Sequence, residues 1–408
     1  MNSGTIFRST LLALALVAGV PMAQAQTDAK SETVRPEIGK PLQEAAELVK
    51  AKQFSEALAK IKSTDAVTDR TPFENLTIDR MRGAAAAGAG QLDVAVEAFQ
   101  RVIDSARLPP AEQLQLVEGI TASYFKAENY PKAIVWAQRY FKEGGTSENI
   151  RNLQTQAQYH SGDYAAVVGT LKSQMAADAQ AGRPSPEITL QLLADSSLKM
   201  KDMAGYTAAL EMLVQKYPKP TYWTALIAQV SRQPGFSDRH MIDVLRLQRA
   251  TATLTNADDY LLLAELAMQA NLPAEASAVL EEGYAAKLLG SGTQSKRAEK
   301  LRARAGTLAA GDLKVLPDSE ITAQKAPTGA ALVNVGTNYL GQKQYQKAAT
   351  LLQQGIAKGG LKRPEEAKLH LGIALQLAGD KPAAATALKA VQGKDGAADL
   401  ARIWSYAS

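Results

Sequence analysis

Residues able to do acid–base or metal chemistry are scattered along this sequence. The three histidines lie far apart and have no H-x3-H, H-E-x2-H or cysteine companion of the kind that binds zinc: His160, His240 and His370. Carboxylate pairs such as Asp258-Asp259 are adjacent residues, which do not face each other on a helix and cannot share acid–base work. Neither a G-x-S-x-G elbow nor a G-x4-G-K-[ST] phosphate loop occurs. The sequence therefore predicts no catalytic residue, no metal ion and no cofactor.

A second polar pattern points to binding. Asn149, Asn152 and Gln156 recur at three- and four-residue spacing, and Tyr159 follows three residues later. On a helix these side chains share one face. Amide groups both donate and accept hydrogen bonds, so they could bond an extended peptide backbone while Tyr159 packs on a side chain. The alternative is that these amides simply face water.

A helix must carry these amides, and helical patterns repeat along the chain. The clearest repeat lies in residues 329–392, where one order of large and small residues occurs twice, 36 residues apart. The first copy has Leu332, Val335, Gly336, Tyr339, Ala348 and Leu352; the second has Lys368, Leu371, Gly372, Leu375, Ala384 and Leu388. Two copies of a helical pattern in succession predict two helical hairpins.

The repeat extends through most of the chain. Each predicted hairpin has an anchor, a residue where its two helices cross closely: Ala57, Ala95, Ala133, Val167, Tyr206, Ala276, Ala348 and Ala384. Successive anchors are separated by 38, 38, 34, 39, 70, 72 and 36 residues. The two long steps are about twice the others, which predicts one unit with a lost signature in each interval.

This order of residues resembles the tetratricopeptide repeat, W-x2-L-G-x2-Y followed by A-x3-F, over most of residues 42–393. The resemblance implies an all-α fold, a right-handed superhelical solenoid of antiparallel helix hairpins. The irregular stretch 290–329 leaves open one continuous superhelix or two arrays joined by a hinge. Three segments, residues 216–223, 234–239 and 283–284, further resemble proteobacterial periplasmic repeat proteins, some of them associated with TonB-type systems.

In such repeats the first helix of each hairpin lines a concave surface that binds a partner. Carried over to this sequence, that surface comprises Arg80, Glu118, Phe125, Asn149, Asn152, Gln156 and Tyr159. The resemblance implies a protein–protein interaction scaffold that binds a protein or peptide partner and is no enzyme. The alternative is an accessory component of an envelope machine, for nutrient uptake of the TonB type or for glycan handling.

The start of the chain indicates export. Arg8 precedes an apolar run over residues 11–20, and Ala23-Gln24-Ala25 offers a cleavage site, which is typical of a secretory signal. We therefore expect a periplasmic protein with a partner in the cell envelope. No later run of 18 apolar residues occurs, so we expect no membrane-spanning segment after cleavage. The predicted organisation is 1–25 signal peptide, 26–41 flexible lead-in, 42–218 N-terminal array, 219–312 degenerate helical repeats, 313–329 linker, and 330–408 C-terminal hairpins and cap.

Composition favours a large helical core without disulfide bonds. The 408 residues include no cysteine, 46% are hydrophobic and only 6% are aromatic, so buried Ala and Leu must stabilise the fold. The formal net charge of +5 falls to +4 without Arg8, too mild and too dispersed to predict nucleic-acid binding. The one dense basic run, residues 296–304, fits the solvated face of a helix, with an anionic partner as the alternative.

Overall fold

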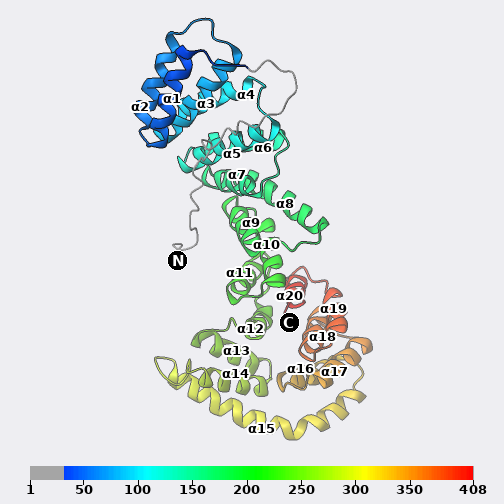
Figure 1. Ribbon diagram of the computed structural model, residues 1–408. Helices are drawn as coiled ribbons and strands as arrows, with labels where there is room; N and C mark the ends of the chain where they lie inside the picture. Colours follow the sequence, from blue (N-terminus) through cyan, green and yellow to red (C-terminus); the bar gives the residue numbers. More distant parts are fainter. Residues whose placement is uncertain (1–31, 408) are drawn as a thin grey trace. The chain divides into compact units, whose positions relative to one another are not determined.

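The computed structural model describes residues 32–407, and this part of the chain is α-helical without a strand (Figure 1). The predicted signal peptide and the first residues of the lead-in lie outside the described residues. The chain divides into two compact units, Met1–Ser173 and Gln174–Ser408. The boundary falls within α8 (Tyr164–Gln180).

In the N-terminal unit, consecutive helices pair as hairpins that stack in chain order. Its other elements are α1 (Pro36–Lys50), α2 (Phe54–Ser63), η1 (Thr64–Ala66), α3 (Pro72–Gly88), α4 (Leu92–Asp104), α5 (Pro110–Lys126), α6 (Tyr130–Lys142) and α7 (Glu148–His160).

The C-terminal unit begins with the same arrangement, and its hairpins also follow one another in contact. Its elements are α9 (Glu187–Lys199), α10 (Met203–Lys216), α11 (Pro220–Ser231), η2 (Asp238–His240), α12 (Met241–Ala250), α13 (Ala257–Gln269), α14 (Pro273–Ala285), α15 (Ser295–Lys325), α16 (Ala330–Gly341), α17 (Tyr345–Lys358), α18 (Pro364–Leu377), α19 (Lys381–Lys389) and α20 (Ala397–Trp404). The all-α solenoid of stacked hairpins is thus confirmed, whereas its right-handed superhelical path stays a prediction.

The repeat register is confirmed by where the anchors lie. Each of the eight anchors is the fourth residue of the second helix of its hairpin. All are buried except Tyr206, which is half-buried, as expected for a large residue at a close crossing. The lost unit between Tyr206 and Ala276 is the hairpin of α11 and α12, whose fourth residue, Val244, is buried at 4% exposure.

The turns inside the hairpins share one backbone conformation. A single left-handed residue stands five positions before each anchor, with φ between 56° and 85°, from Lys52 to Gly379. In the first turn, the N–H of Gln53 bonds the carbonyl of Leu48 at 2.8 Å, and that of Lys52 bonds Val49 at 3.0 Å. This pair of bonds satisfies the last carbonyls of the first helix and reverses the chain within three residues.

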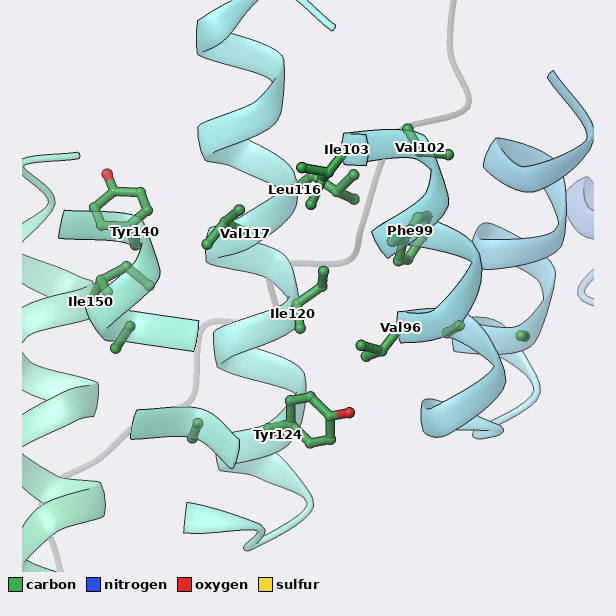
Figure 2. Packing of buried hydrophobic residues seen from close by; sticks show 14 of the residues in the cluster. Val96, Phe99, Val102, Ile103, Leu116, Val117, Ile120, Tyr124, Tyr140 and Ile150 are labelled. Carbon is green, nitrogen blue, oxygen red and sulfur yellow. The ribbon is translucent and has the colours of Figure 1, made fainter. Parts of the chain in front are cut away.

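Small residues allow the two helices to touch at each crossing. A Cβ added to Gly83 would lie 2.3 Å from the ring of Phe99, and one on Gly372 would lie 2.4 Å from Leu388. Since real atoms do not approach so closely, a side chain at either glycine would push the helices apart. Between hairpins, larger apolar side chains fill the space: Figure 2 shows Val96 and Phe99 of α4 opposite residues of α5 such as Ile120.

The predicted linker 313–329 is wrong for most of its length, because α15 runs unbroken to Lys325. Pro317 removes one backbone hydrogen bond and bends a helix without ending it when packing holds both sides. Here Leu316 and Ala323 are buried, and Glu320 bonds Tyr339 of α16 at 2.9 Å. Figure 1 shows α15 curving along its length, so one long helix replaces the hairpin expected between Ala276 and Ala348.

The predicted flexible lead-in 26–41 is also wrong from Pro36 onward, where α1 begins. Pro36 suits the first helical position, which needs no N–H donor. Arg35 fixes this start, since its backbone N–H and guanidinium bond both carboxylate oxygens of Glu74 at 2.8–3.0 Å. Glu74 closes a capping box with Thr71 at the start of α3, so one buried carboxylate joins the first two hairpins.

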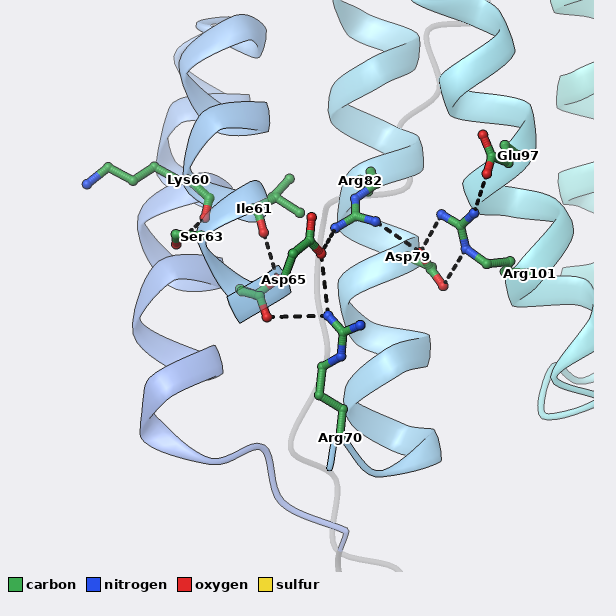
Figure 3. Close-up of polar contacts among 10 residues, drawn as sticks. Lys60, Ile61, Ser63, Asp65, Arg70, Asp79, Arg82, Glu97 and Arg101 are labelled. Carbon is green, nitrogen blue, oxygen red and sulfur yellow. Dashed lines mark hydrogen bonds and ion pairs between the residues drawn. The ribbon is translucent and has the colours of Figure 1, made fainter. Parts of the chain in front are cut away.

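A chain of ion pairs adds a second connection between the first two hairpins (Figure 3). Arg82 of α3 contacts Asp65 of η1 at 2.6 Å and Asp79 at 3.9 Å, and Arg101 of α4 contacts Asp79 at 2.9 Å. Asp79 is buried, but Asp65, Arg82 and Arg101 are partly exposed, so each pair contributes modestly to stability. The pairs fix the orientation of neighbouring helices.

None of the helices formed by the described residues is both long and apolar enough to cross a membrane.

Replacing Ala95 by Leu tests the helix crossings. The side chain is 1% exposed, so extra methylenes must push α3 and α4 apart, and we expect the free energy of unfolding to fall by about 1–3 kcal/mol. Urea unfolding followed by circular dichroism measures the loss. Val94→Leu on the same helix is the control, since Val94 is 40% exposed. Equal stability of the two variants would contradict the repeat register.

Replacing Glu74 by Gln tests the Arg35–Glu74 contact. Hydrogen bonds from the Arg35 side chain and the Thr71 backbone lower the pKa of Glu74 to about 2, below its ordinary value of about 4.3. A lowered carboxyl pKa stabilises the fold above the ordinary pKa, and that contribution is lost as pH falls toward about 2. Urea midpoints measured from pH 6 to pH 2.5 should therefore fall less steeply in Glu74→Gln than in the parent. Glu97→Gln, an exposed acid of α4, should keep the parent's slope; identical slopes for all three proteins would contradict this assignment.

Candidate functional site

The repeat places the predicted binding residues at equivalent points of three successive hairpins in the N-terminal unit. Arg80, Glu118 and Asn152 each lie fifteen residues before the anchor of their hairpin, on α3, α5 and α7. Phe125 and Tyr159 each lie eight residues before theirs. The predicted residues thus recur on the same face of each first helix.

Two of these residues are engaged within the chain. Arg80 is exposed and forms an ion pair with Glu112 of α5. Glu118 is half-buried and accepts a hydrogen bond from the hydroxyl of Ser147 at 3.3 Å. Both contacts join neighbouring hairpins, so these charged side chains help to position the first helices. Because they already have partners within the protein, they are less available to a ligand.

The amide face, defined as Asn149, Asn152 and Gln156, is different. Asn149 and Asn152 are exposed and Gln156 is half-buried, and among residues 32–407 none of the three side chains makes a hydrogen bond. Their helix is held from its opposite side, where Ile150 and Ala157 are fully buried. These amides therefore have free donors and acceptors on a rigid support.

Aromatic side chains border the amide face. Phe125 is half-buried, and its ring lies 5.7 Å from that of Tyr130, edge to face at 67°. The ring of Tyr159, also half-buried, lies 5.4 Å from that of Tyr164 at 71°. The structure thus places the predicted amides and Tyr159 on one face of α7, while Arg80 belongs to a separate ion pair.

In the C-terminal unit the equivalent positions differ between hairpins, with Gln191 of α9 exposed and Val333 of α16 half-buried. Leu261 and Leu369, fifteen residues before their anchors, are 1% and 0% exposed. Four charged or polar residues lie buried between α12, α14 and α18: Asp243, Arg246, Glu275 and His370.

Arg246 is the centre of this buried cluster. Its guanidinium donates to both carboxylate oxygens of Glu275 at 2.8 and 2.6 Å and to Asp243 at 2.8 Å. The Nε2 of His370 lies 3.1 Å from Asp243, which is 127 residues earlier in the sequence. Such fork-shaped pairing holds three helices at a fixed separation.

The charges of the cluster depend on one another. Burial by itself would raise the pKa of Asp243 and of Glu275. Contacts with His370 and Arg246 outweigh burial for Asp243, and contacts chiefly with Arg246 outweigh it for Glu275, so both pKa values are lowered. Burial would lower the pKa of Arg246, but Glu275 and Asp243 raise it. All three therefore stay ionised in the interior, where each needs its partner.

Further contacts connect residues 395–406 to α10 and to the start of η2. Tyr406 donates to Glu211 at 3.1 Å, Arg402 pairs with the same carboxylate, and the N–H of Ser237 bonds the carbonyl of Asp395 at 2.9 Å. Sequence reasoning missed these residues and the buried cluster. The only local signal was the i, i+3 spacing of Asp243 and Arg246, which also fits an exposed pair.

Histidine and carboxylate side chains in residues 32–407 form no group of three that could hold a metal ion. In the buried cluster, Arg246 occupies the position between Asp243 and Glu275 that a cation would need.

No protein-family model matches the sequence, and no curated protein matches it significantly. Solved structures similar to it include tetratricopeptide-repeat proteins. The TPR2AB domain–pHSP90 complex of yeast Sti1 is 17% identical, with 66% of this chain and 98% of that chain covered and a TM-score of 0.32. A tetratricopeptide repeat protein from Parabacteroides merdae is 12% identical, with 83% and 99% covered and a TM-score of 0.31. The TPR domain of P58(IPK) is 13% identical, with 84% and 98% covered and a TM-score of 0.22.

Replacing Arg246 by Met tests the buried cluster. The substitution leaves Asp243 and Glu275 buried without their cation, so we expect the free energy of unfolding to fall by about 3–5 kcal/mol. The control is Arg297→Met, which removes an ion pair with Glu265 in which the arginine side chain is 53% exposed and should cost below about 1 kcal/mol. Thermal unfolding of both variants measures the difference. Equal losses in the free energy of unfolding would mean that the buried cluster stabilises the C-terminal unit no more than an exposed ion pair does.

Proposed function

We propose that this protein is a non-catalytic scaffold that binds a protein or peptide partner through the N-terminal unit. The amide face carries the proposal, because Asn149, Asn152 and Gln156 are accessible and have no hydrogen-bond partner within the described residues. Side-chain amides match the alternating donors and acceptors of a peptide backbone. In the C-terminal unit, two of the equivalent positions are occupied by the buried Leu261 and Leu369.

We further propose that the scaffold works in the periplasm. This rests on the signal-like pattern of residues 1–25, and it is tested by N-terminal sequencing of the protein from a periplasmic extract, which should begin at Gln26. An association with TonB-type uptake systems or with glycan handling rests on sequence resemblance alone. Affinity capture from solubilised envelope, followed by mass spectrometry, distinguishes these settings by the proteins recovered.

Replacing Asn152 and Gln156 together by Ala tests the binding surface. Loss of two side-chain hydrogen bonds should weaken binding of a captured partner about tenfold, with helicity and unfolding unchanged. Isothermal titration with the purified partner measures the affinity.

A matched control removes two exposed amides elsewhere. Gln346 and Gln353 lie seven residues apart on α17 in the C-terminal unit, and Gln346→Ala/Gln353→Ala should leave the affinity unchanged. Equal effects of the two double variants, or none from Asn152→Ala/Gln156→Ala, would exclude the amide face as the binding surface.

A further inference from the structure

The third and fourth hairpins carry the same aromatic pair at the same place. Phe125 and Tyr159 lie eight residues before their anchors, and Tyr130 and Tyr164 lie three residues before them. The two pairs have nearly the same geometry, with ring centroids 5.7 and 5.4 Å apart and planes at 67° and 71°. The repeat thus builds one arrangement of rings twice.

His160 joins the two pairs. Its ring stacks on Tyr130, with centroids 4.9 Å apart and planes at 15°, and lies edge to face with Tyr159 at 6.1 Å. The result is a row of five rings, which we call the aromatic row: Phe125, Tyr130, His160, Tyr159 and Tyr164. His160 is exposed and the other four are half-buried, so the row is accessible along its length.

The backbone holds these rings rigidly. Tyr130 and Tyr164 are the first residues of α6 and α8, directly after the tight turns of their hairpins. Asn129 caps α6 by accepting the N–H of Lys132 at 3.3 Å, and Asp163 accepts the N–H of Ala166 at 3.0 Å. A partner that bound the row would therefore meet preformed rings and lose little entropy in ordering them.

The row is confined to two hairpins and borders the amide face. In the second hairpin the equivalent residues are Ala87 and Leu92, which offer no rings. On α7, Gln156 precedes Tyr159 by three residues and His160 by four, so its amide lies on the same side of the helix as the rings. Aromatic rings beside free amides favour an uncharged, hydrogen-bonding ligand.

We propose that the aromatic row and the amide face together bind a proline-rich segment of the partner in the polyproline II conformation. Proline rings pack against aromatic faces set at an angle to one another, as in other proline-binding grooves. A polyproline II chain has no internal hydrogen bonds, so its carbonyls are free to accept from Asn152 and Gln156. Its conformation is already extended, so binding costs less ordering than for a flexible peptide.

This inference rests on the proposed scaffold function and specifies its ligand. Oligosaccharide binding is the alternative outcome of the test.

The test uses the chain from Gln26 onward and a fluorescein-labelled ten-residue oligoproline, with a Gly/Ser peptide of equal length and chitohexaose as competitors for comparison. Fluorescence anisotropy should show saturable oligoproline binding that excess unlabelled oligoproline displaces and the other two do not. Tyr130→Leu/Tyr164→Leu, which keeps apolar bulk in place, should raise the Kd at least about tenfold, because aromatic residues dominate such contacts.

Tyr345→Leu is the matched control. Tyr345 occupies the same repeat position in α17, three residues before Ala348, but its partner position holds Leu340 and it lacks a ring neighbour among the described residues. This variant should bind oligoproline within about twofold of the parent. Circular dichroism melts of both variants separate lost binding from lost folding.

Oligoproline binding no tighter than Gly/Ser peptide binding, an unchanged Kd in the double tyrosine variant, or displacement by chitohexaose would each overturn the inference. The scaffold function would survive that result if a captured partner still bound in an Asn152- and Gln156-dependent way. If the Tyr130→Leu/Tyr164→Leu and Asn152→Ala/Gln156→Ala variants each lose both oligoproline binding and partner binding, the aromatic row and the amide face form one continuous site.

Discussion

Close contact between the two helices of each hairpin is the constraint on which the rest of this structure depends. At the crossing, a small residue such as Ala95 or Gly83 lets the second helix approach until side chains interlock. The left-handed turn residue five positions earlier fixes the direction of approach. Because each of the eight anchored hairpins has this left-handed turn, equivalent positions of successive first helices recur on one face. A short pattern in the sequence thereby becomes a surface.

The two units are distinguished by their polar groups. In the C-terminal unit a buried ionic cluster joins three helices, because Arg246 bonds carboxylates of α12 and α14 and His370 of α18 reaches Asp243. In the N-terminal unit the amides of α7 are accessible and have no partner within the described residues. Buried ionic pairing offers little net stability over apolar packing but is specific in geometry, which suits a role in holding helices in register.

Rigidity links the fold to the proposed binding. The aromatic and amide side chains stand on helix ends and turns whose backbones are capped and whose opposite faces are buried, as with Ile150 on α7. A surface so arranged changes little on binding, and its selectivity follows from ring geometry and from the spacing of donors. The ion pairs of Arg80 and Glu118 contribute by fixing how neighbouring hairpins meet.

The sequence by itself determined the hairpin register, because the small anchors and the turn residues obey local rules of helix packing and chain reversal. It also placed Asn149, Asn152 and Gln156 on one helical face, since that requires only the period of a helix. The sequence did not determine whether the helix ends or continues at Pro317. That depends on packing, here of α15 against α16. Nor did it reveal the pairing of Asp243 with His370, 127 residues apart, or the ring contacts that join Tyr130 to His160. Those contacts depend on which faces meet after the hairpins stack, and only the tertiary structure decided that.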